Sequence, residues 1–186
     1  MAKEDGKTSI SSQIEPNDFV RKSLDEWKMS LVSTSEDLVA LRNKMFSVLT
    51  FRPYDDETKE AEKQIRWRRT GSQVLEDGFV YQGKACTDLV VTFLTFARAG
   101  GVKGTRFVKL KNNNTGMVHS VGEFELVDGW YTFDVANRTS TPLKGEIKED
   151  VPWGGLPNGP YLLWKKGRDS WDLGLTEFDS IEKIKI

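Results

Sequence analysis

The chain contains one cysteine and one histidine, and the cysteine stands where it could act as a nucleophile. Cys86 opens a run in which apolar residues recur at helical spacing: Leu89, Val90, Phe93, Leu94 and Ala97. In the first turn of a helix, a thiol meets free backbone N–H groups and the positive end of the helix dipole, which favour the thiolate. The same N–H groups could stabilise an oxyanion formed when the sulfur attacks a carbonyl.

A thiol nucleophile needs a base and an acid that orients the base. His119 lies in "MVHSVGEFEL", a stretch that reads as a strand, and Asp134 lies in the next such stretch, "WYTFDV". A lone carboxylate inside an apolar strand is costly to bury and therefore needs a partner. Residue types and order thus favour Cys86 as nucleophile, His119 as base and Asp134 as orienting acid.

Each of these residues also has a structural interpretation. A free cysteine is among the residues most often buried, so Cys86 taken alone is best explained as core packing. A single histidine in a strand is more often a structural residue than a catalyst, and Asp134 could cap the turn at residues 136–140. The catalytic hypothesis depends on the three residues together.

The elements that must position these residues suggest an α+β fold. Residues 17–69 show helical periodicity, with Thr34 and Asp37 forming a capping-box signal before an apolar stripe. After the helix that begins at Cys86 and ends at Gly100-Gly101, alternating stretches predict antiparallel strands near residues 105–110, 117–126, 130–135 and 161–166. Helices followed by strands favour an antiparallel sheet packed on helices.

Length and composition favour one domain. With 186 residues we expect a disordered tail over residues 1–16 and a single domain over 17–186, divided into a helical part (17–70), a catalytic core (71–140) and a C-terminal extension (141–186). A single cysteine excludes an intramolecular disulfide, and the first residues carry no signal-peptide pattern, so we expect a cytoplasmic protein.

The region from about residue 71 to residue 137 resembles the transglutaminase-like superfamily of papain-type cysteine enzymes. That family opens its core helix with a cysteine in a "G-x-C-x-D" context, matched here by Gly83, Cys86 and Asp88 with one extra residue. The other matches are Arg98, Ala99, Gly101 and Arg106 after the helix, Glu123 in the histidine segment, and Asp128, Gly129, Trp130 and Asp134 in the following turn and strand. The resemblance covers about a third of the chain and implies a Cys86–His119–Asp134 triad in a papain/transglutaminase-like core.

The chain also departs from the family pattern. Val121 stands where the family usually has Trp, and Val135-Ala136 replaces the common Pro-Thr, which bears on substrate specificity. The family tends to supply an oxyanion donor before the cysteine. Gln82 is our candidate for that role, with Gln73 and Trp67 as alternatives.

A simple turn between the two strands would keep His119 and Asp134 apart. If Asp128-Gly129 were a two-residue turn, His119 would pair with residue 138, and Asp134 would lie four residues away, roughly 13 Å at the usual rise per residue. Contact between the two side chains therefore predicts a longer turn, a bulge, or a register centred near residues 126–127.

Two functions follow from the residues and the resemblance. The first is a cysteine protease or amidase acting on a peptide or protein amide through a Cys86 thioester, or a transglutaminase if an amine accepts the acyl group. The alternative is a binding or scaffold module that keeps the fold without turnover.

We expect no cofactor, because one His and one Cys are too few for a zinc site. We also expect no nucleic-acid or membrane partner, because the net charge is −1 and the apolar stretch at residues 89–97 is too short to span a bilayer. The oligomeric state stays open.

Overall fold

A computed structural model describes residues 12–184. The helices are α1 (Asp18–Glu26), α2 (Ser35–Val48), α3 (Lys59–Ile65), α4 (Gly71–Asp77), α5 (Cys86–Ala99) and α6 (Ser180–Lys183). The strands are β1 (Thr50–Arg52), β2 (Phe79–Tyr81), β3 (Gly104–Asn112), β4 (Val118–Leu126), β5 (Gly129–Phe133), β6 (Leu143–Lys144) and β7 (Tyr161–Gly167). The predicted α+β class with an antiparallel sheet is confirmed.

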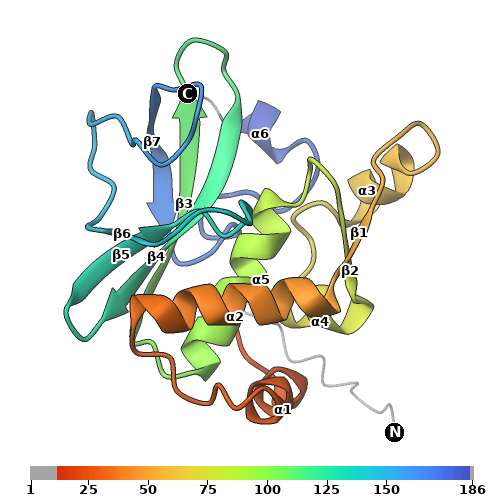
Figure 1. The fold of residues 1–186 in the computed structure, drawn as a ribbon. Coiled ribbons are helices and arrows are strands. Elements are labelled where there is room, and N and C mark those ends of the chain that lie inside the picture. Colours follow the sequence, from red (N-terminus) through yellow and green to blue (C-terminus); the bar gives the residue numbers. More distant parts are fainter. Residues whose placement is uncertain (1–11, 185–186) are drawn as a thin grey trace, which may run out of the picture.

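Helix α5 is the centre of the molecule. It stands between the sheet on one side and the α3–β1–β2 region on the other, with α2 crossing it and α1 below (Figure 1). Most of its side chains are buried, and apart from three threonines the buried ones are apolar, as expected of a central helix. The helix ends at Ala99, and Gly101 follows with a φ of 90°, a conformation that glycine adopts without steric cost.

Five antiparallel strands form the main sheet in the order β6-β5-β4-β3-β7. Helix α5 packs on one face of this sheet through Phe93, whose ring meets Phe124 of β4 and Phe133 of β5 at centroid distances of 5.2 and 5.7 Å. On the other face Val108, Leu110 and Val121 form a second apolar cluster with Ile147 and Tyr161. The strands that carry the site are therefore buried on both faces.

The β4–β5 hairpin has a register between the two considered from the sequence. Leu126 pairs with Gly129, so Val127 and Asp128 form the two-residue turn, and the last paired residues are Gly122 and Phe133. The register is centred on residues 127–128, one position beyond the expected 126–127, and the simple turn at Asp128-Gly129 is excluded. In this register residues 119 and 134 lie only two positions out of alignment, close enough for a diagonal contact.

A short parallel pair, β1 with β2, was not anticipated from the sequence. Its strands flank the helical segment α3–α4, and β2 leads into the turn before Cys86. Helix α4 begins with a capping box, in which Thr70 and Gln73 bond each other's backbone N–H groups. The predicted capping box of Thr34 and Asp37 at the start of α2 is also present.

The prediction of a disordered tail is wrong for residues 12–16, whereas residues 1–11 lie outside the described part of the chain. Gln13 and Ile14 are fully buried, and Ser12 is nearly so. The reason is a set of long-range hydrogen bonds: Ser12 Oγ and the Gln13 N–H both donate to the buried Asp169 carboxylate, at 2.9 and 3.0 Å. The polar side chains that suggested disorder thus form buried hydrogen bonds between residues 12–13 and Asp169.

Across residues 12–184, none of the helices is long and apolar enough to cross a membrane.

Candidate active site

Cys86 is the first residue of α5, as the sequence predicted, and its side chain is half-buried. The residue before it, Ala85, supplies no side-chain cap. The Leu89 N–H donates to the Ala85 carbonyl at 2.8 Å, so the N–H groups of residues 86–88 precede the first helical hydrogen bond. The thiol therefore lies at a helix end whose N–H groups and dipole both favour negative charge.

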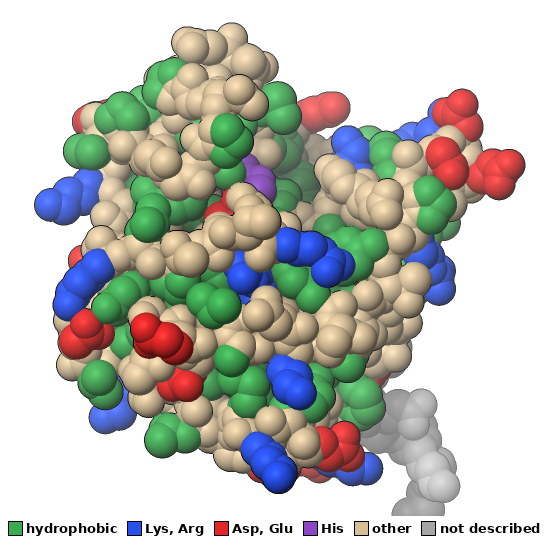
Figure 2. Space-filling view, in the orientation of Figure 1, with side chains coloured by type: hydrophobic (Ala, Val, Ile, Leu, Met, Phe, Trp, Pro, Cys, Tyr) green, Lys and Arg blue, Asp and Glu red, His purple; other side chains and the backbone are tan. Residues whose placement is uncertain are grey.

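His119 and Asp134 are in direct contact. The Nε2 atom of His119 lies 2.9 Å from Oδ1 of Asp134, which also accepts the Ala136 N–H at 3.2 Å. The carboxylate side chain is 2% exposed and the imidazole 22% exposed. The purple histidine side chain reaches the surface in a hollow of the face seen in Figure 2. With Nε2 held by the carboxylate, Nδ1 is the nitrogen left to interact with the hydrogen-bonded Cys86 thiol.

The electrostatics of the three groups favour a thiolate–imidazolium pair. Burial opposes the charged form of Cys86, but the charge of Lys109 and hydrogen bonds from His119 and Ser120 outweigh it and lower the thiol pKa to about 5. Burial also opposes the charged imidazole, but hydrogen bonds with Asp134 and Cys86 raise the pKa of His119 to about 10. Between these two values the sulfur is anionic and the ring cationic, which is the reactive state of a cysteine nucleophile.

The loop that follows Asp134 is tied to helix α2. Arg42, 3% exposed, donates through Nη1 to the carbonyls of Asn137 at 3.0 Å and Ser140 at 2.6 Å. The Ser140 hydroxyl in turn donates to the Asp134 carbonyl at 2.5 Å. Burial lowers the pKa of Arg42, and the negative charge of Asp134 opposes that shift. Arg42 therefore holds the loop that directly follows Asp134.

A hollow of about 250 Å³ opens beside the thiol. Its lining includes Cys86, Thr87, Lys109, Trp67 and Lys84. Trp67 has a φ of 60°, which is uncommon for a bulky residue and costs backbone strain. Its carbonyl accepts the Gln13 side chain at 3.1 Å and the Trp171 indole N–H at 2.6 Å. These bonds hold an aromatic ring in the wall of the hollow.

Of the three expected oxyanion donors, the structure brings only Trp67 into this lining. Gln82 is exposed, and its amide donates weakly to the Phe51 carbonyl at 3.4 Å, away from the hollow. The reason is local: Gln82 follows β2 and continues its pairing with β1, so its side chain extends over that strand pair. Gln73 is engaged in the capping box of α4.

Lys109 is the residue at this site that sequence reasoning missed. It lies on β3 opposite Ser120, is 2% exposed, and directs its ammonium toward the start of α5. The sequence does carry a signal for it, because Lys109 stands at an inward position of a strand that has apolar residues on both faces. Among residues 12–184, no cluster of three or more His, Cys, Asp and Glu side chains could hold a metal ion.

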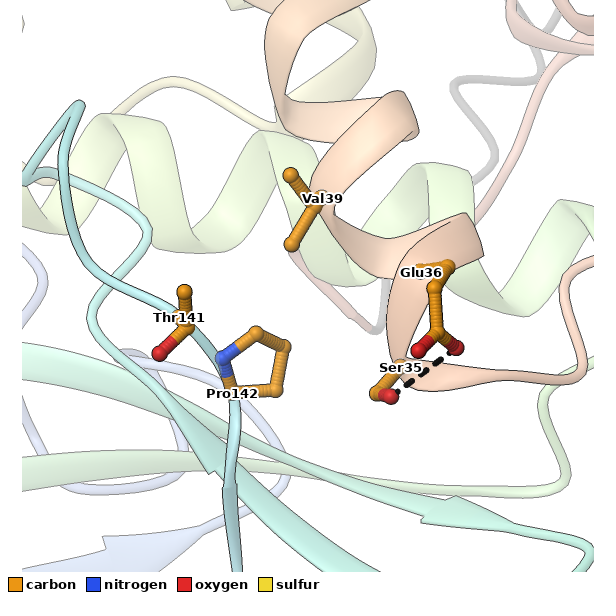
Figure 3. Close-up of a pocket in the computed structure, with 5 residues that line it drawn as sticks. All are labelled: Ser35, Glu36, Val39, Thr141 and Pro142. Atoms are coloured by element: carbon orange, nitrogen blue, oxygen red, sulfur yellow. Dashed lines mark hydrogen bonds between the residues drawn. The ribbon is translucent and has the colours of Figure 1, made fainter.

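A second hollow, of about 300 Å³, lies between the start of α2 and the segment before β6. Figure 3 shows Ser35, Glu36 and Val39 of α2 facing Thr141 and Pro142, with Ser35 and Glu36 hydrogen-bonded to each other at 3.0 Å. Cys86, His119 and Asp134 do not line it, and its one carboxylate is bonded to a neighbouring hydroxyl on its own helix. This hollow therefore lies apart from the candidate site at Cys86.

The chain matches no known family model and no curated protein. Its structure is similar to the crystal structure of a "putative cysteine protease" from Cytophaga hutchinsonii, with a TM-score of 0.54 and 13% sequence identity. The similarity covers 88% of this chain and 48% of that one, so this chain spans about half the length of its structural neighbour. At this identity the comparison shows likeness of fold.

Proposed function

We propose that this protein is a thiol-dependent acyl-transfer enzyme of the transglutaminase-like type that hydrolyses an amide bond, as a cysteine protease or amidase does. The observation that carries the proposal is the 2.9 Å hydrogen bond between His119 Nε2 and Asp134, with the Cys86 thiol close enough to the imidazole for each to shift the pKa of the other. The α+β fold and its likeness to the Cytophaga hutchinsonii protein support the same reading.

In the first half of the reaction the Cys86 thiolate attacks the amide carbonyl carbon. A C–S bond forms and the carbonyl π electrons move to oxygen, where the N–H groups at the start of α5 stabilise the negative charge. The His119 imidazolium then gives its proton to the amine as the C–N bond breaks, leaving a thioester on Cys86. Asp134 orients the ring throughout and stabilises its charged form.

In the second half a water molecule attacks the thioester while the neutral His119 accepts its proton. The tetrahedral intermediate expels the thiolate and releases the carboxylic acid, restoring the starting pair. The 22% exposure of His119 and the open hollow beside Cys86 favour water as acceptor, because transfer to an amine requires a site that keeps water out.

The test is mass spectrometry of the intact protein after incubation with a library of peptides and small amides. We expect an acyl adduct on wild-type Cys86 that hydroxylamine removes, as it does a thioester, and no adduct on Cys86→Ala. Gln82→Ala is a matched control outside the hollow and should form the adduct at the wild-type rate. Addition of a primary amine distinguishes the acceptors, since a transglutaminase would release an amide and a hydrolase the free acid.

Absence of any adduct, in a protein whose thiol still alkylates rapidly below pH 7, would contradict the enzyme and favour the binding module. Ordinary thiol reactivity, unchanged in His119→Ala, would remove the chemical basis of the proposal altogether.

A further inference from the structure

Lys109 is a buried cation whose hydrogen-bond partners are neutral. Its ammonium donates to Ser120 Oγ at 2.9 Å and to Thr87 Oγ1 at 3.3 Å, and its side chain is almost completely buried. Within residues 12–184 no carboxylate forms a salt bridge with it. Because an ammonium without a counter-charge is expensive to bury, the fold must either deprotonate it or supply an anion.

The other charged side chains near the site have partners of their own, which are carboxylates for the two arginines and an aromatic ring for Lys84. Arg66, which also lines the hollow, pairs with the buried Glu62, and Asp88 in the first turn of α5 pairs with Arg69 at 2.6 Å. Lys84 at the rim places its ammonium 4.8 Å from the centre of the Tyr54 ring. The Lys109 ammonium lies 5.6 Å from the centre of the Trp67 ring, which is a neutral contact, and the residue of the same lining that can supply a negative charge is Cys86.

We propose that the Lys109 ammonium is the counter-ion of the Cys86 thiolate, so that the nucleophile is held between two cations, His119 on one side and Lys109 on the other. The hydroxyls of Thr87 and Ser120 position the ammonium, since Thr87 follows Cys86 on α5 and Ser120 follows His119 on β4. The four groups then form a row of alternating charges that sum to zero: Lys109 and His119 are positive, and Cys86 and Asp134 are negative.

The electrostatics of the site agree with this geometry. Burial raises the thiol pKa, and the charge of Lys109 is the largest effect that lowers it. Conversely, burial lowers the pKa of Lys109 and the neighbouring Arg66 lowers it further, whereas the charge of Cys86 opposes both. Each group thus favours the charged form of the other.

The inference rests on the proposed function for its consequence in catalysis. In the thioester the sulfur is neutral, and Lys109 has lost its counter-ion. Expulsion of the thiolate during hydrolysis restores the pair, so Lys109 should assist the second half of the reaction by stabilising the leaving sulfur. His119 is neutral when it activates water, so Lys109 is the group that can meet the negative charge returning to the sulfur as the thiolate leaves.

The test compares the pH dependence of thiol alkylation by iodoacetamide in wild type and Lys109→Met. Methionine approximates the length of the side chain without its charge. Thr87 Oγ1 and Ser120 Oγ are already hydrogen-bonded to each other at 3.0 Å, so both hydroxyls keep a partner once the ammonium is gone. The matched control is Lys111→Met, on the same strand and half-buried, which leaves Lys109 in place.

We expect the wild-type midpoint at about pH 5 and the Lys109→Met midpoint about 2 units higher, as for loss of an adjacent opposite charge. At pH 6 that shift leaves roughly a tenth of the thiol ionised instead of about nine-tenths, so alkylation slows about tenfold. Lys111→Met should follow the wild-type curve. Lys109→Gln, which keeps donors for both hydroxyls, should show the same upward shift and serves if methionine disturbs packing.

An unchanged midpoint in folded Lys109→Met or Lys109→Gln would overturn the inference and leave Lys109 a structural residue. Alkylation needs no substrate, so this outcome is separate from failure of the proposed function. If only the proposed function fails, the alkylation midpoint will be low in the wild type and higher in Lys109→Met, but no amide will give an acyl adduct.

Discussion

Replacement of Asp134 by asparagine should lower the pKa of His119 by about 2 units. The substitution keeps the shape of the side chain and an oxygen that can accept from Nε2, but it removes the negative charge 2.9 Å from the ring. At an effective dielectric constant near 20, two unit charges about 4 Å apart attract by roughly 4 kcal/mol. A neutral hydrogen bond recovers about 1 kcal/mol, and the remaining ~3 kcal/mol corresponds to about 2 pKa units.

The sign follows from which form the carboxylate stabilises. Asp134 favours the imidazolium, so its loss lets His119 release its proton at a lower pH than the wild-type value of about 10. The alkaline limit of the thiolate–imidazolium pair should therefore fall to about pH 8. The acid limit is set by the thiol and should move much less, because Lys109 and the imidazolium are still present below that pH.

The assay is an NMR titration of the imidazole Cε1–H resonance, which is unambiguous because the chain has one histidine. Asp128→Asn is the matched control: Asp128 lies in the β4–β5 turn and accepts from Tyr131 and Lys144, both at 2.8 Å, without contact with His119. It should leave the midpoint unchanged. A wild-type midpoint near 6.5, or an Asp134→Asn midpoint equal to the wild-type one, would refute the reasoning.

Two further substitutions test how the chain around the site supports it. Gln13→Ala removes side-chain bonds to the Trp67 and Arg69 carbonyls and to Ser170, and should lower the free energy of unfolding by roughly 3 kcal/mol in urea titrations. Arg42→Met should cost about 2–4 kcal/mol in the same measurement and slow acyl-adduct formation, because the loop after Asp134 loses the three hydrogen bonds that Arg42 donates to it. An Arg42→Met variant with unchanged stability and rate would show that the loop holds its own conformation.

The sequence was most informative where one pattern determines both structure and chemistry. The apolar run after Cys86 has to be a helix, and a helix that starts at a cysteine places the thiol at its positive end, as found. The alternating stretches around His119 and Asp134 likewise indicated a hairpin. Its register could be narrowed only by requiring contact between the two side chains, and the turn proved to be Val127-Asp128.

Residues brought to the site by long-range contacts could not be predicted in the same way. Lys109 stands among apolar residues in the sequence, but its place at the site depends on Ser120 of β4 and Thr87 of α5, which only the folded chain brings to it. Gln82 precedes Cys86 closely in sequence, yet the strand pair β1–β2 holds it outside the hollow, whereas Trp67, 19 positions before the cysteine, lines it. Closeness to Cys86 along the chain did not predict which residues line the hollow, because the loop before α5 changes direction at Gly83, which has a φ of 70°.

The N-terminal residues acquire a role from the same contacts. Gln13 is more than 70 positions from Cys86, but its amide donates to the carbonyls of Trp67, which lines the hollow, and of Arg69. From the other side, Arg42 of α2 holds the loop that carries Asp134. The segment with Gln13 thus supports the wall beside Cys86, and helix α2 supports the loop after Asp134. Because the strain at Trp67 must be offset by its neighbours, a chain lacking residues 12–16 should relax this ring away from Cys86 even where Cys86, His119 and Asp134 keep their places.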